Sequence, residues 1–172
     1  MEGGIPWAWV ILGLITLQRL AELVLAKRNT ARLLAKGGTE AGAGHYPLIV
    51  LLHAAWLLVL WLLVPGDSPI GMPFLIAAVL LQGLRYWVIA TLGPYWTTRI
   101  ITLPDAPLIA SGLYRFLKHP NYVVVVLEIA LIPLIFGAWE IAAVFSVLNA
   151  IALAIRIRAE DEALRPRRDA SR

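Results

Sequence analysis

Five long apolar runs constrain this chain more than any other feature of its sequence. They cover residues 5–25, 46–64, 70–92, 123–136 and 139–155. A helix needs about 20 apolar residues to cross the hydrocarbon core of a bilayer, and only the fourth run falls clearly short of that length. Gly137 and Ala138 alone separate the last two runs, which predicts a tight turn and a helical hairpin. We therefore expect an all-α integral membrane protein with about five transmembrane helices in one domain, 1–172.

The composition agrees with this expectation. Hydrophobic residues make up 60% of the chain and charged residues 15%, whereas about a quarter of the residues in a soluble domain are charged. The absence of cysteine excludes disulfides and Cys-ligated metals. No His-Glu-x-x-His string is present either, so no metal site is expected. The lipid bilayer is the expected partner, and nucleic acid is not.

Basic residues lie on only one side of the predicted helices. The opposite side carries Glu2, Asp67 and Glu140 but no Lys or Arg. Short loops rich in Lys and Arg stay in the cytoplasm. We therefore expect the N-terminus outside and the C-terminus in the cytoplasm. Five spans agree with this, because an odd number of spans places the two termini on opposite sides of the membrane. The basic residues are Lys27, Arg28, Arg32, Lys36, Arg99, Arg115, Lys118, Arg158, Arg165, Arg167, Arg168 and Arg172.

The two longest connections both lie on the predicted cytoplasmic side. The first, 29–44, contains four glycines and is expected to be irregular at its centre. It lacks the Gly-Lys-Ser/Thr ending of a phosphate-binding loop, so nucleotide binding there is not expected. The second, 95–118, is moderately apolar and predicts a loop lying against the membrane surface.

Several charged residues fall within or at the ends of the apolar runs. Each costs about 2.5–3.5 kcal/mol at the bilayer centre, so such residues normally face partners or a wet cavity. Arg19 and Glu22 share a helix face, which predicts either an ion pair that locks helix packing or the polar wall of a substrate cavity open to the cytoplasm. His45 and His53, eight residues apart, either join that substrate site or serve only in helix packing. The charged residues are Arg19, Glu22, Arg85, Glu128 and Arg156.

The stretch GLYRFLKHPNYVVVVLEI, residues 112–129, places basic residues directly before an apolar run. Pro120 suits the first position of a helix, with His119 as its N-cap. The free N–H groups and the positive end of the helix dipole would then form an anion site, to which Lys118 and Arg115 add positive charge. The alternative is an ordinary helix start with basic side chains that reach to the membrane surface.

A second polar cluster, RIRAEDEAL, occupies residues 156–164. Arg156 and Glu160 are four residues apart on one helix face. The helical hairpin should return this segment beside His119 and Tyr122, so that donors and carboxylates meet at the inner membrane surface. Such a site suits a cationic zwitterion such as S-adenosylmethionine. The alternative is a solvated, charged helix end.

At these residues the chain resembles the isoprenylcysteine carboxyl methyltransferase family of integral membrane methyltransferases. The matching strings are GLYRFLKHPNY, RIRAEDEAL and the GPYW turn at 93–96, with Lys118 and Asp161 where the family more often has Arg and Glu. The resemblance implies a cytoplasmic-side cofactor region, 93–164, after N-terminal helices within 5–92. The strings QRLAEL, KRN, GGTEAGAGHY and LLHAAW resemble a bacterial subgroup, some members of which methylate the enol hydroxyl of long-chain alkylpyrones.

The resemblance also implies residue roles. Arg156 and Glu160 would be catalytic, with Arg156 at the acceptor beside Arg19, Glu22, His45 and His53 as substrate-binding residues. Residues expected to bind S-adenosylmethionine are Arg99, Ala106, Pro107, Leu108, Ile109, Tyr114, His119, Pro120, Asn121, Tyr122 and Glu160.

The chemistry of methyl transfer favours an acceptor with an anionic oxygen, because such a group needs no general base. The resemblance implies that this acceptor is lipophilic, either a prenylated cysteine carboxylate or an alkylpyrone enol. It would enter from the bilayer, while the cofactor enters from the cytoplasm. Three alternatives remain at this stage. They are an N-methyltransferase of phospholipid amines, a non-enzymatic membrane scaffold, and a nicotinamide-dependent membrane reductase.

Overall fold

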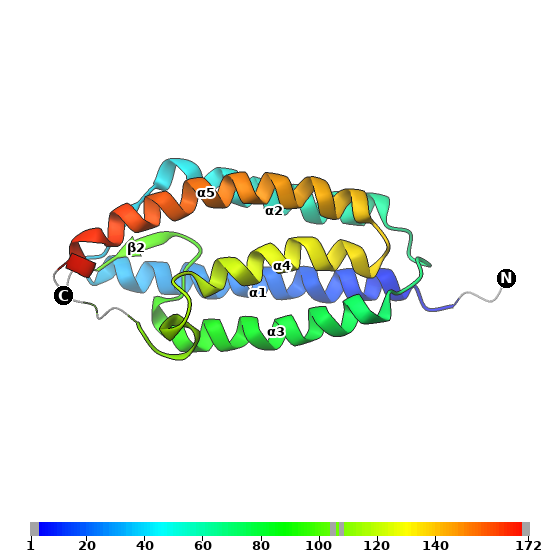
Figure 1. The fold of residues 1–172 in the computed structure, drawn as a ribbon, viewed down its shortest axis with the longest axis horizontal. Helices are drawn as coiled ribbons and strands as arrows, with labels where there is room; N and C mark the ends of the chain where they lie inside the picture. The colour runs from blue at the N-terminus through cyan, green and yellow to red at the C-terminus, as the bar shows by residue number, and fades with distance from the viewer. Residues whose placement is uncertain (1–3, 104–105, 107–108, 170–172) are drawn as a thin grey trace.

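Five long helices lie side by side and alternate in direction, so that the two termini are at opposite ends of the bundle (Figure 1). The structure is a computed structural model that describes residues 4–103, 106 and 109–169, the last four by their backbone alone. The helices are α1 (Trp7–Ala35), α2 (Tyr46–Leu63), α3 (Met72–Leu92), α4 (Pro120–Ile135) and α5 (Trp139–Asp169). The predicted all-α membrane architecture is confirmed.

Four of these helices are long and apolar enough to cross a membrane, and α4 is a shorter apolar helix. The apolar side chains on the outside of the bundle are widely exposed, as Leu62 and Leu80 show at 71% each. Such a continuous exposed apolar surface is suited to lipid rather than water. The helices extend past the predicted spans: α1 continues ten residues beyond residue 25, and α5 continues to Asp169.

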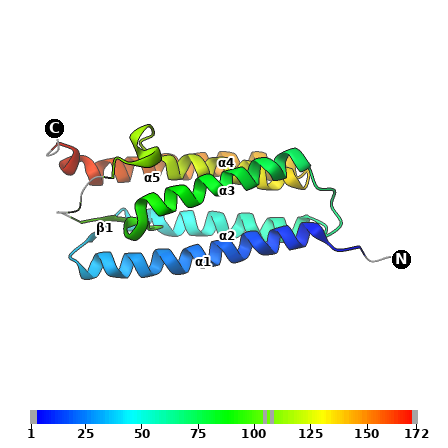
Figure 2. The ribbon, with the colours of Figure 1, turned by 90° about the horizontal axis from the view of Figure 1, so that it is seen from below.

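Four pairs of helices pack against each other, namely α3 with α4, α4 with α5, α5 with α2 and α2 with α1. Figure 2 shows the same bundle from below, with α1 and α2 on one side and α4 and α5 on the other. The hairpin between α4 and α5 was predicted correctly. Gly137 has φ +71°, a conformation that glycine adopts easily and that allows the tight turn. The hairpin brings the start of α4 beside the end of α5.

The connections contain a small sheet that the sequence interpretation missed. Strand β1 (Thr39–Ala41) pairs antiparallel with β2 (Ile100–Thr102). The segment that contains β1 was expected to be irregular, and the segment that contains β2 was expected to be a plain surface loop. For these six residues both expectations were wrong. The Thr39 and Thr102 hydroxyls are 2.9 Å apart, and Arg99 binds Glu40. Pairs so distant along the chain leave no periodic signal in either segment.

A network of four charged side chains joins α1, α3 and α4 inside the bundle. Arg85 donates to both carboxylate oxygens of Glu22, at 2.6 and 2.5 Å, and to Glu128 at 2.7 Å. Arg19 lies 3.2 Å from Glu22 and 2.8 Å from Glu128. Two cations and two anions balance one another, which is how charge is normally accommodated in a membrane. The predicted Arg19–Glu22 pair is therefore confirmed as half of a larger network.

Candidate functional site

The site is built where the segment before α4 meets the end of α5. Gly112 opens this segment with φ +57°, and a Cβ there would lie 2.9 Å from the Thr91 hydroxyl of α3. Glycine thus allows both the backbone conformation and the close approach to α3. The short helix η3 (Gly112–Arg115) follows, and Pro120 then begins α4 with His119 at the N-cap position. The His119 side chain, however, makes no capping hydrogen bond.

His119 instead contacts the acidic cluster of α5. Its Nε2 lies 3.2 Å from Asp161 Oδ1, and its Nδ1 lies 3.9 Å from Glu160 Oε2. Lys118 binds the other Asp161 oxygen at 2.7 Å. The predicted meeting of the two polar clusters is therefore confirmed, although the imidazole faces α5 rather than capping α4.

Tyr122 connects the two charged ends of this arrangement. Arg156 Nε donates to the Tyr122 hydroxyl at 2.9 Å, and that hydroxyl donates to Glu160. Arg156 Nη2 also donates to the Thr98 carbonyl at 2.7 Å. The sequence placed Arg156 and Glu160 on one helix face, and the structure shows that the Tyr122 hydroxyl lies between them. Only 6% of Arg156 is exposed, so its guanidinium is held in a fixed position.

Tyr114 lies beside the same carboxylate. Its burial raises the pKa of its phenol, and the negative charge of Glu160 raises that pKa further. Tyr114 therefore stays a neutral hydroxyl at physiological pH.

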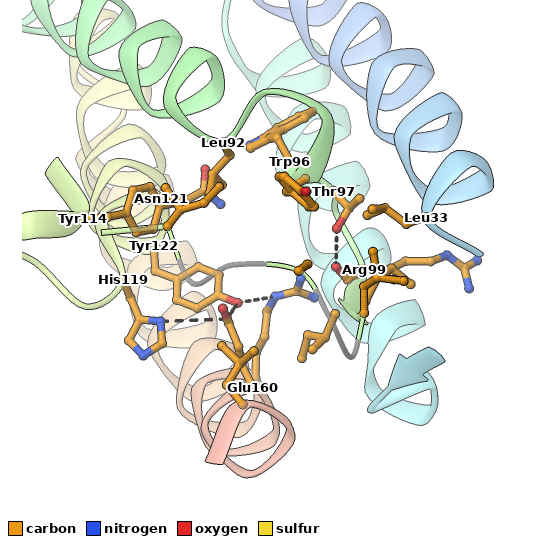
Figure 3. A pocket seen from close by; sticks show the side chains of 18 of the residues that line it. Leu33, Leu92, Trp96, Thr97, Arg99, Tyr114, His119, Asn121, Tyr122 and Glu160 are labelled. Carbon is orange, nitrogen blue, oxygen red and sulfur yellow. Dashed lines mark hydrogen bonds and ion pairs between the residues drawn. The ribbon is translucent and has the colours of Figure 1, made fainter. Parts of the chain in front are cut away.

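A cavity of about 320 Å³, here called the polar cavity, lies against this cluster. Figure 3 shows His119, Tyr122 and Glu160 on one side of it and Arg99 and Leu33 on the other. Of the residues predicted to bind cofactor, those lining it are Arg99, Ala106, Ile109, Tyr114, His119, Asn121, Tyr122 and Glu160. Pro120 is buried at the start of α4 and does not line it, while Pro107 and Leu108 fall outside the described residues.

Arg99 has a second set of contacts. Its Nη1 donates to both oxygens of Glu40, at 2.9 and 2.8 Å, and its guanidinium carbon lies 4.4 Å from the centre of the Tyr46 ring. The hydrogen bond to Glu40 raises the pKa of Arg99. These contacts hold the β1–β2 sheet and the start of α2 at the edge of the polar cavity.

A second cavity, here called the apolar cavity, has a volume of about 280 Å³ and extends between α1 and α2. Four residues with predicted substrate roles line it: Arg19, Glu22, His53 and Arg156. His45 lies in the short helix η1 (Ala43–His45) and lines neither cavity. The two cavities share five lining residues, namely Trp96, Thr97, Asn121, Tyr122 and Arg156.

Sequence reasoning missed several of these shared and neighbouring residues. Trp96 is 2% exposed, and its position depends on Asn29 of α1, whose amide donates to the Gly93 and Trp96 carbonyls at 3.2 and 2.8 Å. The GPYW turn gave a signal for Trp96. Thr97 and Trp56 gave none, because a Thr in a loop and a Trp in an apolar run are common in any membrane protein.

Comparisons with known proteins agree with this geometry. The model of the isoprenylcysteine carboxyl methyltransferase (ICMT) family matches residues 74–166, more than half of the chain. The uncharacterized protein YpbQ of Bacillus subtilis is 41% identical over 160 residues, which cover 91% of this chain and 95% of the relative. An uncharacterized protein of Haemophilus influenzae is 28% identical over 154 residues, 85% of this chain and 88% of the relative. No solved structure matches the chain. The match spans α3 to α5 and both polar clusters, and the chain therefore belongs to the isoprenylcysteine carboxyl methyltransferase family.

Proposed function

We propose that this protein is an S-adenosylmethionine-dependent O-methyltransferase that acts on a lipophilic acceptor with an anionic oxygen. Membership of the family supports methyltransferase activity in a membrane. The observation that carries the proposal is the meeting of two cavities of different character at one Arg–Tyr pair, of which Arg156 is buried. The polar cavity suits a charged cofactor, and the apolar cavity suits a hydrocarbon chain, with Arg156 and Tyr122 in the wall of both.

The lining of the polar cavity fits S-adenosylmethionine. Glu160 offers carboxylate oxygens to an amine or to ribose hydroxyls, and His119 and Lys118 lie where a carboxylate would find donors. Asn121 adds a buried Oδ1 without a hydrogen-bond partner among the described residues. When bound, S-adenosylmethionine supplies a methyl group on a positively charged sulfur.

Arg156 is the residue proposed to hold the acceptor oxygen. Its bonds to Tyr122 and to the Thr98 carbonyl fix the guanidinium in the shared wall of the two cavities. A buried guanidinium fixed in this way attracts and orients an anionic oxygen, which then needs no proton removed. Acceptors of this class include an isoprenylcysteine carboxylate and an alkylpyrone enol.

The acceptor's chain would reach this wall from the bilayer, between α1 and α2. Leu20 and Leu23 of α1 and Val50 of α2 line the apolar cavity, yet they are 54%, 44% and 39% exposed on the surface of the bundle. A cavity whose edge residues also face lipid is accessible from the side. The cofactor would enter from the opposite direction, at the bundle end that we assign to the cytoplasm by its basic residues.

The test is transfer of labelled methyl groups from S-adenosylmethionine by the purified protein. We would offer S-farnesylcysteine, a long-chain fatty acid and phosphatidylethanolamine separately and identify any labelled lipid. Labelled methyl esters are expected. A labelled lipid amine as the sole product would instead identify an N-methyltransferase, and no labelled lipid together with no binding of S-adenosylhomocysteine would contradict the proposal.

A further inference from the structure

A second group of polar side chains lies deeper in the apolar cavity than the proposed transfer site. His53 and Trp56 on α2 and Arg19 on α1 all line the cavity. Arg19 binds Glu128 at 2.8 Å, so this wall of the cavity reaches the depth of the buried charge network. Glu128 follows Tyr122 by six residues on α4, which is about 9 Å along the helix axis at about 1.5 Å per residue.

His53 offers a hydrogen-bond acceptor to this part of the cavity. Its Nδ1 lies 2.9 Å from the Ile49 carbonyl oxygen. A carbonyl can only accept, so Nδ1 carries the ring proton and Nε2 keeps a lone pair. In the part of the chain that the structure describes, Nε2 has no hydrogen-bond partner.

The other polar atoms of this group are closed off from the cavity. Arg19 Nε and Trp56 Nε1 are buried and form no hydrogen bond with any described residue, so neither can reach a ligand in the cavity. Trp56 as a whole is only 1% exposed. A pure hydrocarbon chain in the cavity would therefore leave the lone pair of His53 Nε2 unsatisfied.

We infer that the apolar cavity recognises a second polar group on the acceptor, a hydroxyl about two helical turns deeper than the methyl-accepting oxygen. A hydroxyl donates one hydrogen bond and accepts two. Its proton therefore matches the lone pair of His53 Nε2. A carbonyl would leave His53 without a donor, and an ammonium group would be repelled by Arg19. This inference rests on the proposed function, because it describes the acceptor of the same site.

The experiment compares a long-chain fatty acid with a series of its monohydroxy derivatives, in which the hydroxyl is moved along the chain. Dissociation constants are measured by calorimetry with the protein in lipid nanodiscs saturated with S-adenosylhomocysteine. We expect one position of the hydroxyl to bind roughly three- to tenfold more tightly than the parent acid, the effect of about one net hydrogen bond. His53→Phe should abolish that preference, measured as the ratio of the two dissociation constants within the same variant. His53→Gln, which retains an acceptor oxygen, should keep part of it.

Leu51→Phe is the matched control on α2, because Leu51 is 67% exposed and lines neither cavity, and it should leave the preference intact. Equal affinity across the series, the same preference in His53→Phe, or binding of neither acid would overturn the inference. A wild-type protein that fails to bind S-adenosylhomocysteine would instead contradict the proposed function itself.

Discussion

The Arg156 guanidinium of α5 donates a 2.9 Å hydrogen bond to the Tyr122 hydroxyl of α4. That hydroxyl donates in turn to Glu160, one turn further along α5. Tyr122 therefore separates a cation from an anion that would otherwise be neighbours on one helix face. The arrangement leaves Glu160 at the polar cavity, whereas Arg156 also lines the apolar cavity.

Replacing Tyr122 with Phe tests this separation with little change in shape. We expect turnover to fall roughly tenfold to a hundredfold, because Arg156 and Glu160 lose a shared partner and a hydrogen bond to a charged group is worth about 1.5–3 kcal/mol. The affinity for S-adenosylhomocysteine should fall as well. Tyr86→Phe is the control, because Tyr86 faces outward from α3 and is 56% exposed. Equal rates for the two variants would show that the Tyr122 hydroxyl has no role.

Gly112→Ala tests the turn that positions His119. A left-handed conformation costs about 1–2 kcal/mol for a residue with a Cβ, and the new methyl group would also lie 2.9 Å from Thr91 Oγ1. We expect weaker binding of S-adenosylhomocysteine and a lower melting temperature. Gly83→Ala, at a position inside α3 where a Cβ meets nothing within 4 Å, should leave the affinity unchanged and keep or slightly raise the melting temperature. Unaltered cofactor affinity in Gly112→Ala would show that the turn does not shape the polar cavity.

Arg85→Met tests the buried charge network. The change leaves Arg19 as the one cation shared by Glu22 and Glu128 within the described network, and breaking a buried pair in this way costs about 3–5 kcal/mol. Glu40→Gln, which breaks the more exposed pair with Arg99, should cost at most about 1 kcal/mol. Thermal or denaturant unfolding in matched detergent micelles measures both. A small effect of Arg85→Met would show that Arg19 alone neutralises both carboxylates.

The sequence predicted the helices and the meeting of the polar clusters because both depend on short-range patterns. Apolar length fixed the spans, and the two-residue link fixed the hairpin that brings Arg156 beside Tyr122. All four charged residues were identified within the apolar runs, but their partners on other helices were not assigned. Helical periodicity tells which residues share a face, as for Arg19 and Glu22, but not which neighbouring helix that face meets.

The missed features depend on contacts between distant segments. The pairing of Thr39 with Thr102 and the hydrogen bonds from Asn29 to the GPYW turn join segments more than 60 residues apart. His119 was correctly placed before α4. That its imidazole contacts Asp161 instead of capping α4 depends on the position of α5, which the sequence pattern does not reveal. For His45, the predicted role in substrate binding stays a prediction.

The orientation in the membrane is a prediction that can be tested directly with introduced cysteines, because the chain has no native cysteine. Lys36 ends α1 and Asp67 follows α2; both are exposed and lie at opposite ends of the bundle. Lys36→Cys should be protected from a membrane-impermeant thiol reagent in intact cells, and Asp67→Cys should react. Both should react after the membrane is made permeable. The reverse pattern would place the polar cavity outside, away from cytoplasmic S-adenosylmethionine.

Arg156→Ala tests whether Arg156 binds the acceptor or contributes to binding of the cofactor. If Arg156 binds the acceptor's anionic oxygen, its removal should lower turnover at saturating cofactor by roughly tenfold to a hundredfold, the effect of a charge-assisted hydrogen bond of about 1.5–3 kcal/mol. Arg156→Lys should restore only part of this, because an ammonium cannot reproduce the planar guanidinium that contacts Tyr122 and Thr98 together.

The cofactor's dissociation constant gives the second measurement for this variant. Arg156 and Glu160, both within the described part of the chain, form no direct ion pair, because the Tyr122 hydroxyl lies between them. Arg156→Ala should therefore weaken binding of S-adenosylhomocysteine less than Glu160→Ala does, because Tyr122 can still donate to Glu160. Normal acceptor kinetics in Arg156→Ala would exclude the anchoring role. Equal losses of cofactor affinity in the two variants would instead mean that Arg156 acts by positioning Tyr122 and Glu160 at the polar cavity.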